Sequence, residues 1–318
     1  MIQQDTEYAE LKAEFEDYYT EKLEPVLQQN EKSRYRYLLF FAILLLLMLV
    51  FYPYMIFCVL HKGLFADNAY VGILLAISCL VVMALCGPMY VYKKKVKPQI
   101  MPELIKFFGD FNYGFEVGLD EAILQQSGLF AKYNNREKDD YFRGKYDGVG
   151  ITIAEEKLRW LKRDYRDFEV KKKVFDGVCI LLEMNKNFAG KTLVLKESGI
   201  FNALNKVEGL QNVKLEDLRF EKYFEVYSDD QIEARYLLTS AFMERILKLR
   251  DLYEGKSIQM SFYNNKLLLA IPTKQNMFEA NSFFGSNLNR QKVNVVFEQF
   301  YTIFSIIKLL KLNQRIGM

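Results

Sequence analysis

The chain has 318 residues, a formal net charge of +3, and hydrophobic residues at 51% of its positions. It contains one histidine, His61, and four cysteines. With no histidine after residue 61, the long C-terminal part has no side chain for a Ser-His-Asp or Cys-His site, a His-ligated zinc, or a haem with a His ligand. The few cysteines suggest no disulfide framework and fit a reducing compartment. We expect no cofactor and no metal.

Residues 1–36 form an acidic N-terminal segment in which 5–30 have the apolar spacing of an amphipathic helix. Pro25 is expected to kink or divide this helix. Two roles are open for it: packing on the body of the protein, or self-association.

Residues 37–60 and 71–92 are apolar stretches without Lys, Arg, Asp or Glu. As helices, each would be about 33–36 Å long, enough to cross a hydrocarbon core of about 30 Å. Basic residues flank the outer ends of the pair: Lys32, Arg34 and Arg36 before it, and Lys93, Lys94, Lys95 and Lys97 after it. The sequence predicts a transmembrane helical hairpin over 37–92 with both termini in the cytoplasm. Because neither stretch carries an ionisable group, we expect an anchor and not a transport path.

Residues 98–318 read as a cytoplasmic mixed α+β domain. In the first half of this domain, the sequence predicts short helices over 101–111 and 119–130. Strands are predicted after them, over 144–155, 174–183 and 192–195. The fold class is therefore α+β, an N-terminal two-helix transmembrane hairpin followed by this domain.

The second half begins with Ser228 to Gln231, which has the form of a capping box and would start a helix through Tyr236. Thr239 or Ser240 should cap a helix over 241–253 that ends at Gly255. Strands over 257–262 and 266–271 flank Asn264-Asn265, a hairpin signal. Residues 291–312 form a long amphipathic pattern, either a core helix or one that lies on a membrane.

Several of these segments resemble one protein family. The runs YFRGKYDGVGITIAEEKL (141–158), FDGVCILLEMNKNFAGKTLVL (175–195), FEKYFEVYSDDQIEARYLLTSAFMERI (220–246) and SFYNNKLLLAI (261–271) are similar to shared blocks of bacterial proteins grouped as domain of unknown function 3137. The resemblance implies a multi-pass protein of the bacterial inner (plasma) membrane. It implies no activity, cofactor or catalytic residue. Family members are sometimes encoded near LemA-type membrane proteins, which implies a LemA-type partner.

The densest polar cluster comprises Asp229, Asp230, Gln231, Glu233 and Arg235. Its carboxylates could hold Mg²⁺ or act as acid and base. Helix capping and ion pairing explain the same residues without a ligand, and this structural role is the one we expect.

A basic segment follows the strand over 144–155: Lys157, Arg159, Lys162, Arg163, Arg166, Lys171, Lys172 and Lys173, with Trp160 among them. A solvated hairpin arm or helix face is expected, and the alternatives are contact with anionic lipid or with a partner. Nucleic acid is not the partner we expect. The acidic pairs Asp139–Asp140 and Glu155–Glu156 are expected on the solvated surface.

These observations favour a membrane-anchored cytoplasmic module that binds or scaffolds another protein, in contact with the lipid bilayer. The alternative is a metal-dependent enzyme that acts on a membrane-proximal substrate through Asp229, Asp230 and Glu233.

Overall fold

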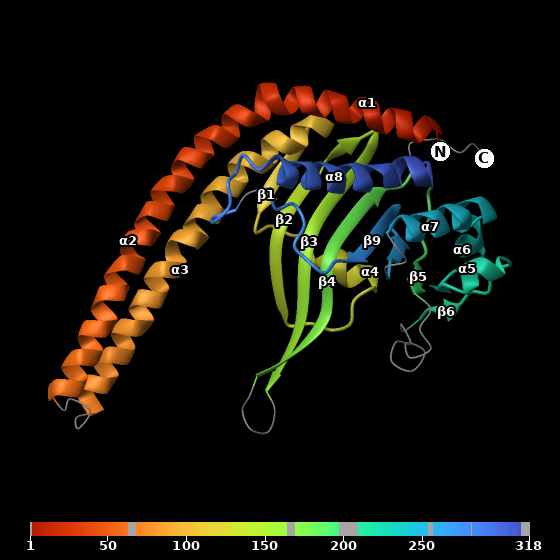
Figure 1. Cartoon of the computed structure of the whole chain (residues 1–318). Coiled ribbons are helices and arrows are strands. Elements are labelled where there is room, and N and C mark those ends of the chain that lie inside the picture. Colours follow the sequence, from red (N-terminus) through yellow and green to blue (C-terminus); the bar gives the residue numbers. More distant parts are fainter. Residues whose placement is uncertain are drawn as a thin grey trace. The chain divides into compact units, whose positions relative to one another are not determined.

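The computed structural model of the chain describes residues 2–62, 68–163, 169–196, 209–253, 257–280 and 282–312. It divides into two compact units (Figure 1). The first unit contains residues 1–107 and 279–295, and the second contains 108–278 and 296–318.

The first unit is built on two long helical stretches. The chain begins with α1 (Ile2–Tyr18), passes through a π-helical turn, η1 (Tyr19–Leu23), and continues as α2 (Glu24–Lys62). The N-terminal helix is thus confirmed, and the irregular turn lies directly before Pro25. A proline has no N–H to donate and its ring crowds the carbonyl four residues earlier, so a widened π turn lets the helix continue past it.

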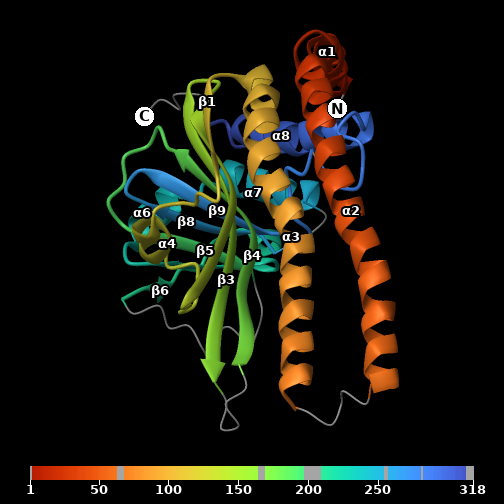
Figure 2. The same ribbon diagram turned by 90° about the vertical axis from the view of Figure 1, so that its left-hand side faces the viewer.

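The second predicted apolar stretch lies within α3 (Asn68–Ile105), which runs beside α2 (Figure 2). The prediction of a separate helix over 101–111 is wrong. Residues 101–105 are the end of α3, residues 106–108 form a 3-10 turn, η3 (Lys106–Phe108), and Phe111 already begins a strand. The end of α3 and the turn η3 pack on α1: Tyr18 donates to the carbonyl of Glu103 in α3, and the ring of Phe107 in η3 lies 5.2 Å from that of Phe15.

By length and composition, two helices of the described residues could cross a membrane: the stretch Thr6–Tyr54, and Arg290–Leu310, whose most apolar window is half buried. No residue in the apolar window of the N-terminal stretch is buried. Leu39 is 64% exposed and Val50 67% exposed. This exposed apolar surface on α2 indicates membrane association.

The second unit contains a nine-stranded antiparallel sheet with the order β1-β2-β3-β4-β9-β8-β5-β7-β6. In chain order the strands are β1 (Phe111–Phe115), β2 (Asn135–Tyr146), β3 (Val149–Arg163), β4 (Glu169–Glu183), β5 (Thr192–Lys196), β6 (Gln211–Asn212), β7 (Phe224–Ser228), β8 (Gln259–Tyr263) and β9 (Lys266–Pro272). The helices are α4 (Glu121–Ser127), α5 (Leu218–Glu221), α6 (Gln231–Leu237), α7 (Ser240–Leu252) and α8 (Arg290–Leu310), and the last begins in the first unit.

Two tight turns set the register of the sheet. Asn264 and Asn265 both have positive φ, 49° and 58°, and join β8 to β9 as predicted. The segment 144–155, which was predicted to have strand character, contains a second such turn. Asp147 and Gly148 have φ of 51° and 78° and join β2 to β3. Positive φ at two successive residues matches the twist of a hairpin, so this turn divides the segment into two strands.

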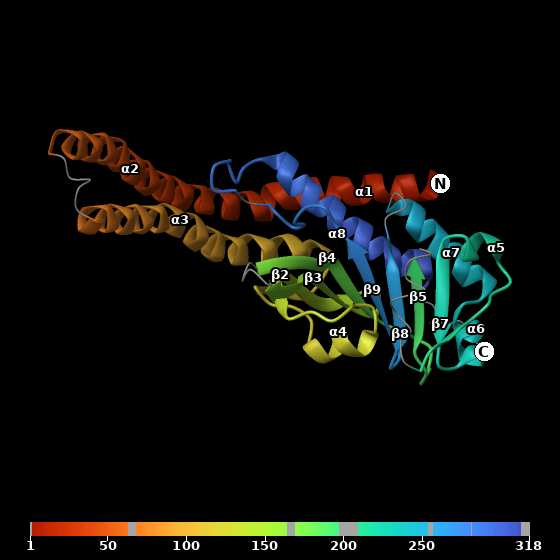
Figure 3. The ribbon, with the colours of Figure 1, turned by 90° about the horizontal axis from the view of Figure 1, so that it is seen from below.

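The two faces of the sheet are covered differently (Figure 3). On one face α8 contributes Phe297, Phe300 and Phe304, which form close ring pairs with residues including Phe108, Phe111, Phe142, Tyr146 and Phe278. The second-unit part of α8 is therefore a core helix. On the other face α4 lies over buried side chains that include Leu158, Cys179, Leu193 and Leu268. The prediction of a mixed α+β fold is confirmed.

Candidate functional site

Residues 157–163 and 169–173 of the basic segment lie in the hairpin made by β3 and β4, which is one of the two expected settings. The pairing of these strands runs out to Arg163 and Glu169, whereas β4 pairs with β9 only from Gly177 onward. Residues 160–163 and 169–172 therefore form a two-stranded arm that extends past the rest of the sheet (Figure 1). Arg166 lies outside the described residues.

One side of the arm combines apolar and basic side chains. Trp160 is opposite Lys172, and Lys162 is opposite Val170. Cross-strand partners and alternate residues along a strand share a face, so these four side chains lie on the same side. Trp160 is 36% exposed and Val170 52% exposed. The aromatic and cationic side chains on this surface are of the kinds that are enriched in protein interfaces.

The base of the arm is held by polar contacts. The Arg159 guanidinium donates to the Asp176 carboxylate at 2.8 Å and to the carbonyl of Phe175 at 2.8 Å. Lys157 donates to the side-chain oxygen of Asn276 at 2.6 Å. These two basic residues fix the arm to the sheet, whereas Lys162 and Lys172 are exposed on it.

An apolar groove of about 430 Å³ lies at the base of the arm. Leu129, Phe130, Phe175 and Pro272 contribute to its lining, and Lys172 and Lys173 line it as well. The basic arm and an apolar recess are therefore contiguous, an arrangement suited to a ligand with both apolar and acidic groups.

The predicted capping box at Ser228 is wrong. The N-cap of α6 is Asp230, whose Oδ1 accepts from the amides of Ile232 and Glu233 at 2.8 and 3.0 Å. Ser228 is the last residue of β7 and is still paired with Thr192, so the helix cannot start there. The Thr239 cap of α7 is confirmed, since its hydroxyl accepts from the amide of Phe242.

The rest of the polar cluster binds main-chain atoms. The two oxygens of Glu233 accept from the amides of Ala189 and Gly190 at 2.9 and 2.7 Å, and Asp229 accepts from the amide of Lys191 at 2.7 Å. Arg235 donates to the carbonyl of Gln231 at 3.0 Å. The five residues are brought together, and two of them, Asp229 and Glu233, hold the connection that leads into β5. This geometry favours a structural role over metal binding or catalysis.

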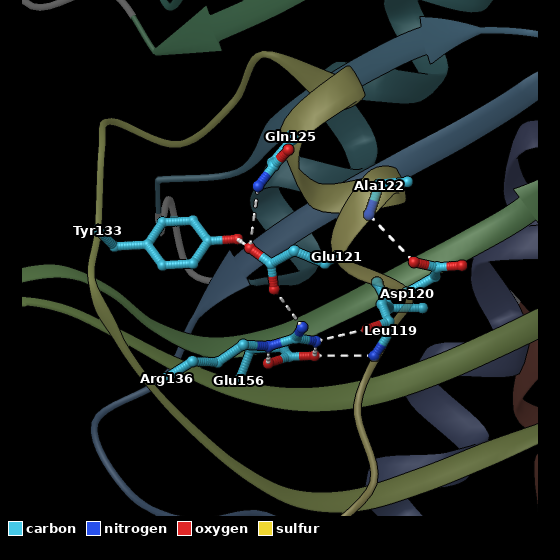
Figure 4. A network of polar contacts seen from close by, with 8 residues as sticks. All are labelled: Leu119, Asp120, Glu121, Ala122, Gln125, Tyr133, Arg136 and Glu156. Carbon is cyan, nitrogen blue, oxygen red and sulfur yellow. Dashed lines mark hydrogen bonds and ion pairs between the residues drawn. The ribbon is translucent and has the colours of Figure 1, made fainter.

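Sequence reasoning missed a second polar network, which joins α4 to β2 and β3 (Figure 4). Arg136 makes two hydrogen bonds to Glu156, from Nε to Oε2 at 2.8 Å and from Nη2 to Oε1 at 2.5 Å. Its Nη1 donates to Glu121 at 2.7 Å, and its Nη2 also donates to the carbonyl of Leu119 at 2.6 Å. Tyr133 donates to the other oxygen of Glu121.

The charges in this network are stabilised by their partners. Burial disfavours the charged form of Glu121, but hydrogen bonds from Tyr133 and Arg136 outweigh burial and hold its pKa below the ordinary value. Burial likewise opposes the charge of Arg136, and the bonds to Glu156 and Glu121 raise its pKa. Glu121 and Arg136 therefore remain ionised at neutral pH.

The expectation that the acidic pairs lie on the solvated surface is wrong for three of the four residues. Glu155, Glu156 and Asp140 are at most 2% exposed. Glu155 accepts from the amide of Met277 at 2.9 Å, and Asp140 accepts from the Tyr113 hydroxyl at 2.7 Å. Adjacent strand residues point to opposite faces, so both faces must be covered for Glu155 and Glu156 to be buried.

Comparison with known proteins supports the family resemblance for part of the chain. Residues 173–312 match the family model described as "Protein of unknown function (DUF3137)". The resemblance is confirmed over this range. The DUF3137 region runs from the inner end of the arm to the end of α8, and it includes three of the four sequence blocks, while 141–158 precedes it.

Among solved structures, the chain is similar to one described as "crystal structure of the mycobacterial trehalose monomycolate transport factor A, TtfA". The identity is 12%, the match covers 68% of this chain and 96% of that one, and the TM-score is 0.35. At this identity and TM-score, the likeness carries no argument about the chain. No curated protein matches the chain.

Proposed function

We propose that the chain is a membrane-anchored binding module that recruits or scaffolds a protein at the cytoplasmic face of the bacterial inner membrane. The apolar groove beside the basic arm is the observation that carries this proposal, because both features belong to one continuous surface of the second unit.

The anchor in this proposal is a multi-pass hairpin formed by α2 and α3. Support comes from the exposed apolar surface of α2 and from the position of the basic residues. Lys32 and Arg36 are exposed before the first stretch, and Lys94 and Lys95 are exposed after the second. Arg34 has another role, since it is buried and bonded to Glu31 at 2.6 Å. The exposed lysines and arginine would keep both termini in the cytoplasm.

The partner in this proposal is a protein segment with apolar and acidic side chains. Its apolar groups would enter the groove, and its carboxylates would face Lys162 and Lys172. Tethering to the membrane raises the local concentration for a partner in the same membrane. A LemA-type membrane protein is the candidate that the family resemblance suggests.

Photo-crosslinking in living cells tests this proposal. A photoreactive amino acid at Val170 should give a discrete protein adduct of the full chain. The same label at Leu218, which is 80% exposed on α5, should not give that adduct. The double variant Lys162→Glu/Lys172→Glu should reduce the Val170 adduct about tenfold or more, because like charges would then oppose the partner.

Two results would contradict the proposal. One is an adduct that forms equally from Val170 and Leu218, and the other is an adduct that persists in the charge-reversed variant. Lipid adducts alone at Val170 would show that the arm contacts the anionic bilayer instead of a protein.

A further inference from the structure

A segment far from the predicted spans in the sequence lies against both of them. Residues 282–289, called the strap, precede α8 and belong to the first unit. They run beside α2 and α3, in blue in Figure 1. On the α2 side, Arg34 donates to the carbonyl of Phe283 at 3.3 Å, and Glu31 accepts from the amide of Asn287 at 2.9 Å.

The strap is bonded to α3 as well. The hydroxyl of Tyr92 donates to the side-chain oxygen of Asn287 at 2.8 Å. Just before the strap, Glu279 binds Lys97 at 2.8 Å and Lys93 at 3.1 Å. Asn287 and Lys97 are fully buried. These contacts fix the position of the strap along both helices.

The strap places two phenylalanines beside the start of the apolar surface. The ring of Phe41 lies 5.7 Å from that of Phe283 and 5.6 Å from that of Phe284. Phe283 also lies 5.5 Å from Tyr92, which in turn lies 5.8 Å from Tyr37. Five aromatic rings from three segments therefore meet at this level.

This level coincides with the boundary of the predicted spans. Phe41 is about 6 Å along the helix axis from Tyr37, where the uncharged stretch begins, at about 1.5 Å per residue. Tyr92 is the last residue before Lys93, Lys94 and Lys95. Aromatic side chains concentrate at this depth in membrane proteins, where the head groups meet the acyl chains.

The exposure of the strap residues matches such a position. Phe283 is buried, whereas Phe284 is 62% exposed although it is large and apolar. Asn287 is bonded to both helices and buried, whereas the exposed ring of Phe284 lies beside Phe41 of α2. Lipid is the surrounding that suits this pattern.

We propose that the strap is a third membrane contact, and that Phe284 enters the interfacial layer of the phospholipid bilayer on the cytoplasmic side. This inference rests on the proposed membrane anchor, to which it adds a segment from the C-terminal part of the chain.

Depth-dependent fluorescence quenching tests the inference on the full chain in proteoliposomes. Trp160 is the chain's single tryptophan, so Trp160→Phe/Phe284→Trp has one reporter at the strap. Two matched variants in the same Trp160→Phe background are Phe40→Trp on α2, where Phe40 is 53% exposed, and Leu218→Trp on α5. Phosphatidylcholine brominated at a shallow or a deep acyl position serves as the quencher.

The expected result is quenching of the Phe284→Trp reporter by shallow bromine at least twofold more than by deep bromine, with blue-shifted emission and no quenching at Leu218→Trp. The inference would be overturned if Phe284→Trp were as unquenched as Leu218→Trp while Phe40→Trp was quenched. That result would leave the anchor intact. If Phe40→Trp is unquenched too, the anchor itself fails. As a control, the unfolding temperature of the Phe284→Trp variant should equal that of its Trp160→Phe parent. Equal temperatures exclude a strap displaced by the substitution.

Discussion

Arg136 on β2 and Glu156 on β3 form a two-point ion pair, at 2.8 and 2.5 Å, inside the second unit. The Glu156 side chain is 0% exposed and that of Arg136 is 10% exposed. The same carboxylate accepts from the amide of Leu119 at 2.9 Å, so the pair also holds the entry to α4. One buried pair thus joins two strands and a helix.

Removing one member of this pair should destabilise the protein strongly. Arg136→Met leaves the Glu156 carboxylate buried without its counter-ion, and we expect a loss of about 3–5 kcal/mol in the free energy of unfolding. The double variant Arg136→Met/Glu156→Leu should regain much of the loss, because no buried charge remains.

Chemical unfolding of the full chain in mild detergent, followed by Trp160 fluorescence, measures the stability of both variants. Lys248→Met, which breaks an exposed pair with Glu244, is the control and should cost less than about 1 kcal/mol. Equal losses in the single variant and the control would contradict this role.

Gly118 should not tolerate a side chain. A Cβ there would lie 2.4 Å from Glu156 Oε1 and 2.7 Å from Arg136 Nη2, and both groups are held by several hydrogen bonds. Gly118→Ala should therefore lower the free energy of unfolding by about 1–3 kcal/mol. Gly148→Asn is the control substitution in open space. A Cβ at Gly148 would have no atom within 4 Å, and asparagine accepts the positive φ of this position. A neutral Gly118→Ala would show that the network is looser than the distances indicate.

Glu121 should make stability depend on pH in the acid range. Its pKa is lower in the folded chain than the unfolded value of about 4.3, so its stabilisation is complete above that pH and is lost as the pH falls through the folded pKa. Glu121→Gln should be less stable than the wild type at pH 7, and the difference should shrink between about pH 5 and about pH 3. Thermal unfolding at a series of pH values measures this. Parallel curves for the two proteins would contradict the assignment.

Asp230 should act as a helix cap and not as a metal ligand. Asp230→Ala should cost about 1 kcal/mol of unfolding free energy, whereas Asp230→Asn should retain most of the stability, because asparagine caps equally well. Calorimetry with Mg²⁺ or Mn²⁺ should show no saturable binding to the wild type. Saturable binding that Asp230→Ala abolishes would favour the metal-dependent enzyme instead.

Local signals in the sequence predicted local structure well. The Asn264-Asn265 turn, the Thr239 cap and the apolar face of α8 are each determined by neighbouring residues, and the structure confirms them. Residues 144–155 were assigned strand character, and the turn at Asp147 and Gly148 divides them between β2 and β3. The basic segment was expected on a solvated hairpin arm or a helix face, and its described residues lie on a hairpin arm.

The polar networks could not be predicted in the same way. Glu156 is buried only because Leu119 and Arg136 come to it from other segments, and a sequence pattern does not contain those contacts. The position of the strap likewise depends on Glu31, Arg34 and Tyr92, which lie in helices at the other end of the chain. Partners that are distant in sequence decide these sites.

Topology mapping tests the central claim, that α2 and α3 form a hairpin with both ends inside the cell. In a variant whose four cysteines are replaced, single cysteines are introduced at Asp67, at Gln4 and at Leu218, and a membrane-impermeant maleimide is applied before and after permeabilisation of the inner membrane. We predict labelling of Asp67→Cys from the outside, and labelling of Gln4→Cys and Leu218→Cys only after permeabilisation. Protection of Asp67→Cys in intact cells, or outside labelling of Gln4→Cys or Leu218→Cys, would contradict the account.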